Sequence, residues 1–163
     1  MRFTSDSIWK LLFLQIKRLN MKKLIIMLIS TISMSSISAQ KYTEQYIKDA
    51  SKVAERWLSD INNKKYENAF QMLSNEVKVI YTQETWISLI NELMPEFGEF
   101  ESRKATEKKF KSEVEGMGDG FYVFLDYESI YTNTITHNEY ILLKQNDKLI
   151  WKIVDYSYEF KNK

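Results

Sequence analysis

The stretch FYVFLDYESIY, residues 121–131, decides the fold. Hydrophobic side chains recur at every second position, and aromatic residues dominate, which is typical of a β-strand with one buried face. Asp126 and Glu128 share one face, so we interpret them as hydrated side chains rather than as an acid-base pair. The opposite face is expected to point into the core and holds Phe121, Val123, Leu125 and Tyr127.

Turn-forming residues on both sides of this stretch indicate three more strands. Three of the four glycines lie within residues 116–120, and polar turns occupy residues 132–134 and 145–148. Together these turns predict further strands over residues 100–114, 137–144 and 149–160. Because the connections are short, we expect neighbouring strands to be antiparallel.

Before Gly98 the hydrophobic period is that of helices. The pattern predicts an amphipathic helix over residues 43–61, a shorter one over residues 66–73, and a third that Thr82 caps and Pro95 ends. Residues 77–81 fit either a helix or an extended segment.

Helices followed by strands indicate an α+β fold, with about three N-terminal helices packed on one face of a curved, four-stranded antiparallel sheet. A long, twisted sheet of this kind curls into a cone, as in cystatin-like and nuclear-transport-factor-2-like folds. Such a cone leaves a mouth between the sheet and the helices.

Residues 21–40, MKKLIIMLISTISMSSISAQ, have the three parts of a secretory signal peptide. Two lysines precede an apolar stretch of about 11 residues, and small residues end at Ala39, after which we expect cleavage. A membrane-spanning helix needs roughly 20 apolar residues, so no stable membrane anchor is expected after cleavage. We therefore predict export to the periplasm or beyond, with residues 41–163 as one domain. Residues 1–20 are either an upstream extension or the result of a start assigned before Met21.

The composition of this domain excludes several classes of function. Residues 41–163 carry 17 basic and 21 acidic side chains, although the whole chain has a net charge of +1. A nucleic-acid binder needs a basic surface, so we expect no nucleic-acid partner. The chain has no cysteine, which excludes disulfides, thiolate metal sites and a cysteine nucleophile. We predict no metal site and no cofactor.

Two pairs of residues on the predicted strands are candidates for chemistry. His137, the only histidine, lies two residues from Glu139 on the same strand face, as a general base and its orienting carboxylate would. The alternative is a structural histidine at the beginning of a strand. Arg103 and Glu139 are expected to point inward and to pair across neighbouring strands, either as a buried structural ion pair or as a clamp for a ligand.

Richness in aromatic residues without a catalytic set predicts a non-enzymatic binding module for a small amphipathic ligand or a short peptide. We expect its pocket between the sheet and the helices to be formed by Trp57, Tyr66, Trp86, Arg103, Tyr127, Glu139 and Trp151. The first alternative is an envelope interaction protein, such as a homodimer through an outer aromatic face made of Tyr122, Phe124, Tyr140, Tyr156 and Tyr158. The second alternative is an enzyme that uses His137.

An ordered series of residues resembles the bacterial family called domain of unknown function 4019, over about residues 54–158. The resemblance implies an exported protein of this fold and carries no activity. One departure is Asp155, where the resemblance would place a glycine. The series that carries it comprises Trp57-Leu58, Lys65-Tyr66, Ala69, Gln83, Trp86, Gly98, Arg103, Gly118-Asp119-Gly120, Tyr122-Val123, Tyr127, Glu139, Trp151-Lys-Ile-Val and Tyr156.

Overall fold

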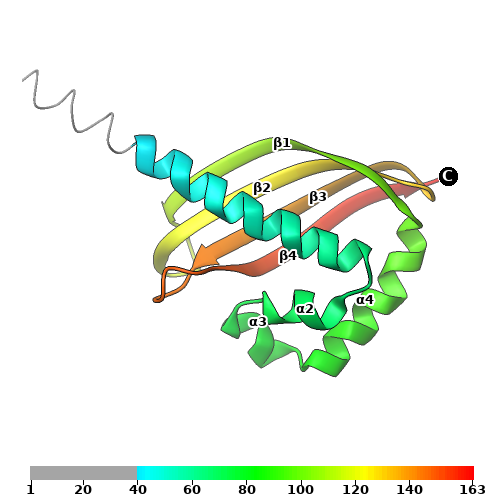
Figure 1. Cartoon of the computed structure of the whole chain (residues 1–163), viewed down its shortest axis with the longest axis horizontal. Helices are drawn as coiled ribbons and strands as arrows, with labels where there is room; N and C mark the ends of the chain where they lie inside the picture. The colour runs from blue at the N-terminus through cyan, green and yellow to red at the C-terminus, as the bar shows by residue number, and fades with distance from the viewer. Residues whose placement is uncertain (1–39) are drawn as a thin grey trace, which may run out of the picture. The chain divides into compact units, whose positions relative to one another are not determined.

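Four antiparallel strands form one curved sheet, and helices lie on one of its faces (Figure 1). The computed structural model describes residues 40–163. The predicted extension over residues 1–20 and all but the last residue of the predicted signal peptide therefore lie outside the described residues. Residues 43–163 form one compact unit. Within the described range, no helix has both the length and the hydrophobicity that crossing a membrane requires.

The strands follow one another in the sheet in the order of the sequence, β1-β2-β3-β4. Their positions agree with the predicted strands to within a few residues. They are β1 (Phe100–Glu113), β2 (Asp119–Tyr131), β3 (Thr134–Gln145) and β4 (Trp151–Asn162). Because each connection is a short hairpin, β1 and β4 become the two edges of the sheet.

The described residues contain four helices rather than three. The first occupies residues 40–62 and is followed by α2 (Tyr66–Gln71), α3 (Asn75–Ile80) and α4 (Gln83–Phe97). The segment that fitted either a helix or an extended chain is α3, whose N-cap Ser74 accepts a hydrogen bond from the Val77 amide at 3.3 Å. The predicted cap of α4 is confirmed, since Thr82 Oγ1 accepts from the Thr85 amide at 3.2 Å.

The prediction that Pro95 ends the third helix was wrong, because α4 continues through Pro95 to Phe97. A proline lacks the amide proton for one helical hydrogen bond and its ring crowds the preceding turn, but the residues after it can still be helical. Gly98 then ends the helix with a φ of 83°, and its amide donates to the Met94 carbonyl at 3.2 Å. The Pro95 carbonyl accepts a side-chain hydrogen bond from Asn133 Nδ2 at 3.1 Å.

The core lies between the first helix and the inner face of the sheet. Val123, Leu125 and Tyr127 are buried there, which confirms the core face predicted for this strand. Phe121 points to the same side, where it packs on Tyr46 with 5.0 Å between ring centroids, but it remains 38% exposed. Other core residues come from the helices and from β3 and β4, namely Ala50, Ala54, Trp57, Leu58, Phe70, Trp86, Ile90, Ile141, Leu143 and Ile153.

A β-bulge in β4 overturns the prediction for two tyrosines. Leu143 of β3 pairs with Ile153 of β4, and Leu142 pairs with Asp155. Val154, between Ile153 and Asp155, therefore has no partner on β3. One extra residue reverses which side chains face inward. The inward positions are therefore Trp151 and Ile153 before the bulge, and Tyr156, Tyr158 and Phe160 after it.

Gly98 lies where the chain leaves α4 and meets the turn between β2 and β3. A Cβ atom at this position would lie 2.2 Å from Thr132 Oγ1 and 2.7 Å from Asn133 Cγ. Thr132 Oγ1 also accepts a hydrogen bond from the Glu99 amide at 2.8 Å, so it cannot move away without losing that bond. Glycine is needed here both for its positive φ and for this close approach.

We predict that Gly98→Ala lowers the free energy of unfolding by more than the roughly 1–2 kcal/mol that a positive φ costs an alanine. Gly116→Ala is the matched control, because Gly116 has a similar φ of 79° and an added Cβ atom there would meet no other atom within 4 Å. Urea denaturation followed by tryptophan fluorescence would measure both variants. Equal losses of stability would mean that the contact with Thr132 is unimportant.

Candidate functional site

A buried carboxylate lies at the centre of the sheet's inner face. Glu139 is 0% exposed, and both of its oxygens accept hydrogen bonds. Oε2 accepts from Arg103 Nε at 2.6 Å and from the Ser129 hydroxyl. Oε1 accepts from the Tyr156 hydroxyl at 2.8 Å and lies 3.3 Å from the Tyr131 hydroxyl. We call Arg103, Ser129, Tyr131, Glu139 and Tyr156 the Glu139 network.

Arg103 and Glu139 form the predicted ion pair, with 2.6 Å between Nη2 and Oε2. They do not lie on neighbouring strands as predicted, since Arg103 belongs to β1 and Glu139 to β3. Arg103 pairs in register with Ser129 of the intervening strand β2. The small serine side chain leaves room for the guanidinium to cross β2, and it accepts a hydrogen bond from Arg103 Nε at 3.0 Å.

Charge and hydrogen bonding outweigh burial in this pair. Burial alone would raise the pKa of Glu139, but the positive charge of Arg103 and the hydrogen bonds from Arg103, Ser129 and Tyr156 lower the pKa overall. Burial likewise would lower the pKa of Arg103, but the charge of Glu139 raises the pKa above its usual value. Both groups are therefore charged at neutral pH.

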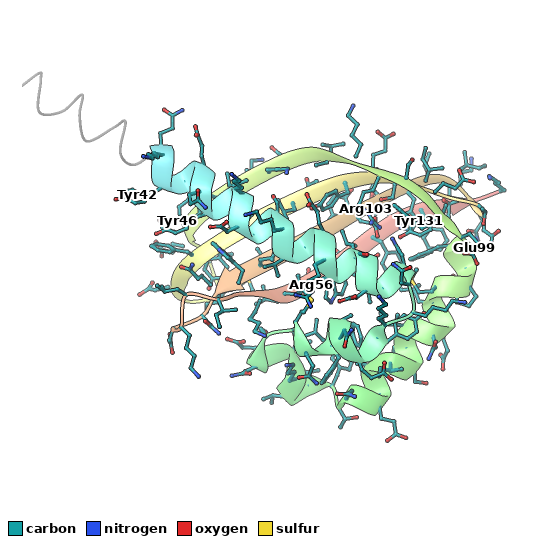
Figure 2. All side chains as sticks on the ribbon, viewed as in Figure 1. Tyr42, Tyr46, Arg56, Glu99, Arg103 and Tyr131 are labelled. Carbon is teal, nitrogen blue, oxygen red and sulfur yellow. The ribbon has the colours of Figure 1, made fainter. Side chains whose placement is uncertain are left out.

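The network reaches two further elements through tyrosine hydroxyls. Tyr131 accepts a hydrogen bond from Arg103 Nη2 at 2.8 Å, and its hydroxyl lies 3.2 Å from Asn62 Oδ1 at the end of the first helix. Figure 2 shows Arg103 and Tyr131 beside each other on the sheet. Burial and the negative charge of Glu139 raise the pKa of Tyr156 well above 10 and also raise the pKa of Tyr131, so both phenols stay protonated as donors.

His137 is packed among aromatic rings near the C-terminal end of α4. It is 1% exposed, and its ring centroid is 4.3 Å from that of Phe97 and 4.7 Å from that of Tyr131. Neither ring nitrogen has a hydrogen-bond partner among residues 40–163. Burial lowers the pKa of His137, so the ring is neutral at neutral pH. The surroundings are those of a packed core residue.

An apolar hollow lies between α3, α4 and β4, and we call it the β4 groove. Its volume is about 470 Å³. Asp155 contributes the one carboxylate of this lining. Three residues on the rim are strongly exposed for hydrophobic side chains, Ile80 at 72%, Leu89 at 46% and Tyr81 at 36%. Aromatic rings form much of the wall and floor, namely Trp57, Trp86, Tyr156 and Tyr158.

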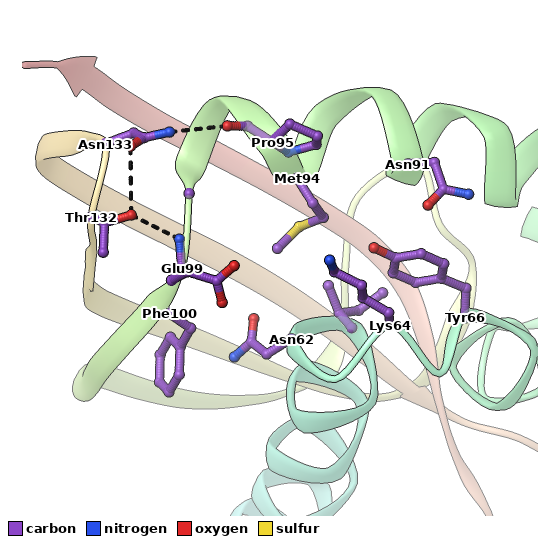
Figure 3. A pocket seen from close by; sticks show the side chains of 12 residues that line it. Asn62, Lys64, Tyr66, Asn91, Met94, Pro95, Glu99, Phe100, Thr132 and Asn133 are labelled. Carbon is purple, nitrogen blue, oxygen red and sulfur yellow. Dashed lines mark hydrogen bonds between the residues drawn. The ribbon is translucent and has the colours of Figure 1, made fainter.

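Two further hollows lie near the end of the first helix. One of about 350 Å³ is lined by Arg103, Tyr127 and Glu55. The Tyr127 hydroxyl is buried there without a partner among the described residues, and burial together with the charge of Glu55 raises its pKa to about 12. The other, of about 430 Å³, is shown in Figure 3, where Lys64 and Glu99 extend into it.

The residues predicted to form one pocket are distributed around the domain. Trp57 and Trp86 line the β4 groove, whereas Arg103 and Tyr127 line the hollow of about 350 Å³. Tyr66 lines the hollow of Figure 3. Glu139 and Trp151 are buried at 0% and 5% exposure and line none of these three hollows. The Glu139 network nevertheless touches the groove, because the Tyr156 ring lines it while the Tyr156 hydroxyl binds Glu139.

Sequence patterns missed several members of this site. Tyr156 was assigned to the outer face, although the break in alternation between Ile153 and Tyr156 was a visible sign of a bulge.

The outer aromatic surface predicted from the sequence is also largely covered. Tyr122 is 0% exposed and donates to the Met117 carbonyl at 2.6 Å, while Lys111 Nζ lies 5.2 Å from the ring centre of Phe124. Among residues 40–163, no three histidine, aspartate or glutamate side chains gather as metal ligands.

Comparison with known families adds one match. The family model described as "Protein of unknown function (DUF4019)" matches residues 53–156. The chain belongs to the DUF4019 family. The match runs from the first helix to Tyr156, so it includes the whole Glu139 network and every residue that lines the β4 groove except Tyr158. No curated protein matches the chain significantly. The sequence resemblance is thereby confirmed as to family, and DUF4019 membership carries no activity with it.

We predict that Arg103→Met lowers the free energy of unfolding by about 3–5 kcal/mol, because it leaves the Glu139 charge buried without its partner. Lys104→Met is the matched control, since Lys104 is the exposed neighbour on the same strand. Adding Glu139→Met to Arg103→Met should recover part of the loss, and denaturant unfolding of the double-mutant cycle measures the recovery. Strictly additive losses would show that the two side chains do not stabilise each other.

We predict that stability falls as the pH drops below about 6.5, the pKa of an unfolded histidine. The folded-state pKa of His137 is lower, so between these two values the unfolded chain binds a proton that the folded chain does not. The contribution of Glu139, whose pKa is also lowered, is present above its unfolded pKa and is lost only at lower pH.

His137→Phe should remove the pH dependence of stability in the range just below about pH 6.5, because the chain has no other histidine. Phenylalanine also has no ring nitrogen to leave unpaired, so stability at pH 7 should be kept or raised. Urea unfolding of both proteins at several pH values gives the slopes. A wild-type protein with no slope in this range would contradict the neutral, buried histidine.

Proposed function

We propose that this protein is a non-enzymatic binding module that holds a small amphipathic ligand or a short peptide in the β4 groove. The observation that carries the proposal is the groove itself, a hollow of about 470 Å³ with aromatic walls and an exposed apolar rim. Volumes of about 300–1,000 Å³ with mostly apolar linings are typical of ligand sites. Exposed apolar side chains gathered around a hollow are typical of a surface that a ligand or a partner covers.

The rim supplies the driving force for binding. Ile80 and Leu89 are 72% and 46% exposed on either side of the groove. Covering apolar surface contributes roughly 25 cal/mol per Å², so an apolar ligand gains most of its affinity here. Trp57 also lines the groove and adds a broad aromatic surface to it.

The Glu139 network has a positioning role in this proposal. Tyr156 forms part of the groove wall, and its hydroxyl donates to Glu139 at 2.8 Å. Arg103 in turn holds the Glu139 carboxylate. The pair predicted to grip a ligand thus acts one step away from it, by fixing the ring against which the ligand packs. Arg103 and Tyr127 keep a direct role only for a ligand that extends into their own hollow.

We further propose that the protein works outside the cytoplasm and that its sheet and helices form a cystatin-like or nuclear-transport-factor-2-like cone. Export rests on the signal-peptide pattern of residues 21–39. The fold assignment rests on a curved antiparallel sheet with its helices on one face. A cone of this kind places the groove where the sheet and the last two helices diverge.

The alternative function is that of an interaction protein, which the exposed side chains of α3 favour. Val79 is 87% exposed beside Ile80. In that case a protein surface, and not a small ligand, would cover the rim. A homodimer of this type would dissociate on Ile80→Ser in analytical ultracentrifugation, whereas a ligand-binding monomer would sediment identically before and after the change.

We predict that Ile80→Ser weakens binding of N-phenyl-1-naphthylamine, an uncharged amphipathic fluorescent probe, by about fivefold, which corresponds to losing roughly 1 kcal/mol of apolar contact. Ile135→Ser is the matched control, because Ile135 is 59% exposed but does not line the groove. Titration followed by probe fluorescence measures both affinities. Equal effects of the two changes, or no binding to the wild-type protein, would argue against the groove as a ligand site.

A further inference from the structure

The outer edge of β4 is an incomplete β-ladder. β4 stands at the end of the sheet order and pairs with β3 alone among the strands. An edge strand presents alternate N–H and C=O groups to the outside, ready to pair with another chain. Within residues 40–163, Ile153 is the residue of β4 whose outward backbone groups are paired. Its N–H and C=O bond to the segment before α3.

That segment shows how an added strand fits this edge. Leu73 forms a parallel bridge with Ile153. The Ile153 amide donates to the Met72 carbonyl at 3.1 Å, and the Ser74 amide donates to the Ile153 carbonyl at 2.8 Å. The chain then turns into α3 at Asn75 and leaves the edge. The ladder therefore stops after one bridge, at the residue where the bulge begins.

The β4 groove opens where this ladder stops. The strand side of its lining consists of Ile153 and the residues that follow it, Val154, Asp155, Tyr156 and Tyr158. The helix side presents Ile80 and Leu89. A peptide lying here in an extended conformation would have backbone partners on one side and an apolar wall on the other. This is the arrangement in which strand addition gives affinity and alternate side chains give specificity.

The charge of the groove lining indicates that the peptide carries a cationic side chain. Asp155 is the only aspartate, glutamate, lysine or arginine that lines the groove, and it is exposed. No ion pair joins it to another described residue. A carboxylate at the rim of an apolar groove attracts a cation and disfavours an anion. The excess of acidic over basic residues in residues 41–163 acts in the same direction.

We propose that the occupant of the β4 groove is an extended peptide that pairs with the outer edge of β4 as a fifth strand and places a lysine or arginine at Asp155. This inference rests on the proposed function, because it names the class of ligand for the same groove. The peptide's apolar side chains pack against α3 and α4, which present Ile80 and Leu89 to the groove.

The test uses a library of capped octapeptides, in which apolar residues alternate with threonine, lysine or glutamate, selected on the intact protein and identified by mass spectrometry. We expect the selected peptides to contain lysine rather than glutamate. Methylating single backbone nitrogens should weaken binding at least tenfold at alternate positions and have little effect at the positions between them. Methylation removes an N–H donor without removing a side chain, so only strand pairing predicts this alternation.

Two variants test the charge and the location. Asp155→Asn should weaken the selected peptides severalfold, while Asp147→Asn, a change of the same kind in the turn before β4, should not. Ile80→Ser should weaken them and Ile135→Ser should not.

The two proposals fail in different ways. If N-phenyl-1-naphthylamine binds the groove but no peptide is selected, or if methylation has no effect at any position, strand addition is overturned and the groove remains a site for small amphipathic molecules. If the probe and the peptides both bind equally well to the Ile80→Ser protein, the groove is not the site and both proposals are overturned.

Discussion

The carboxylate of Glu139, on β3, is bound from each of the other three strands of the sheet. Arg103 reaches it from β1, Ser129 and Tyr131 from β2, and Tyr156 from β4, while Tyr131 also contacts Asn62 of the first helix. A buried charge is costly unless its hydrogen bonds and its counter-charge are all present. Each strand must therefore lie at one register and one distance for the network to close. This constraint holds the inner face of the sheet, and with it one wall of the groove.

The bulge in β4 connects this network to the surface. Without the extra residue between Ile153 and Asp155, Tyr156 would point to the outer face and could not reach Glu139. The same bulge lies where the bridge to Leu73 stops and the groove begins. Bulges commonly redirect side chains and terminate pairing near functional sites. Here one irregularity completes the buried network, forms a wall of the groove and leaves a strand edge available.

Much of the fold follows from local patterns in the chain. Alternation located the four strands, and the turn residues between them located the hairpins, because both depend on neighbours only a few positions away. The Arg103–Glu139 pair was also predictable, since an acid in the middle of an apolar strand needs a cation, and Arg103 is the only arginine in the strand half of the sequence. Pro95 was misjudged because a proline costs one helical hydrogen bond and a clash with the preceding turn, and this cost disfavours a helix without ending it at that residue. Tyr156 was misjudged because strict alternation was assumed through a bulge.

The sequence by itself determined the α+β class, the strand positions, the family and the presence of a buried ion pair, because these depend on periodicity, on turn chemistry and on charge in an apolar setting. Only the tertiary structure decided which hollow each aromatic residue lines, that Arg103 crosses β2 beside Ser129, and that His137 is enclosed by Phe97 and Tyr131. These facts depend on where segments far apart in the chain meet, and a one-residue bulge or the size of one serine is enough to change them.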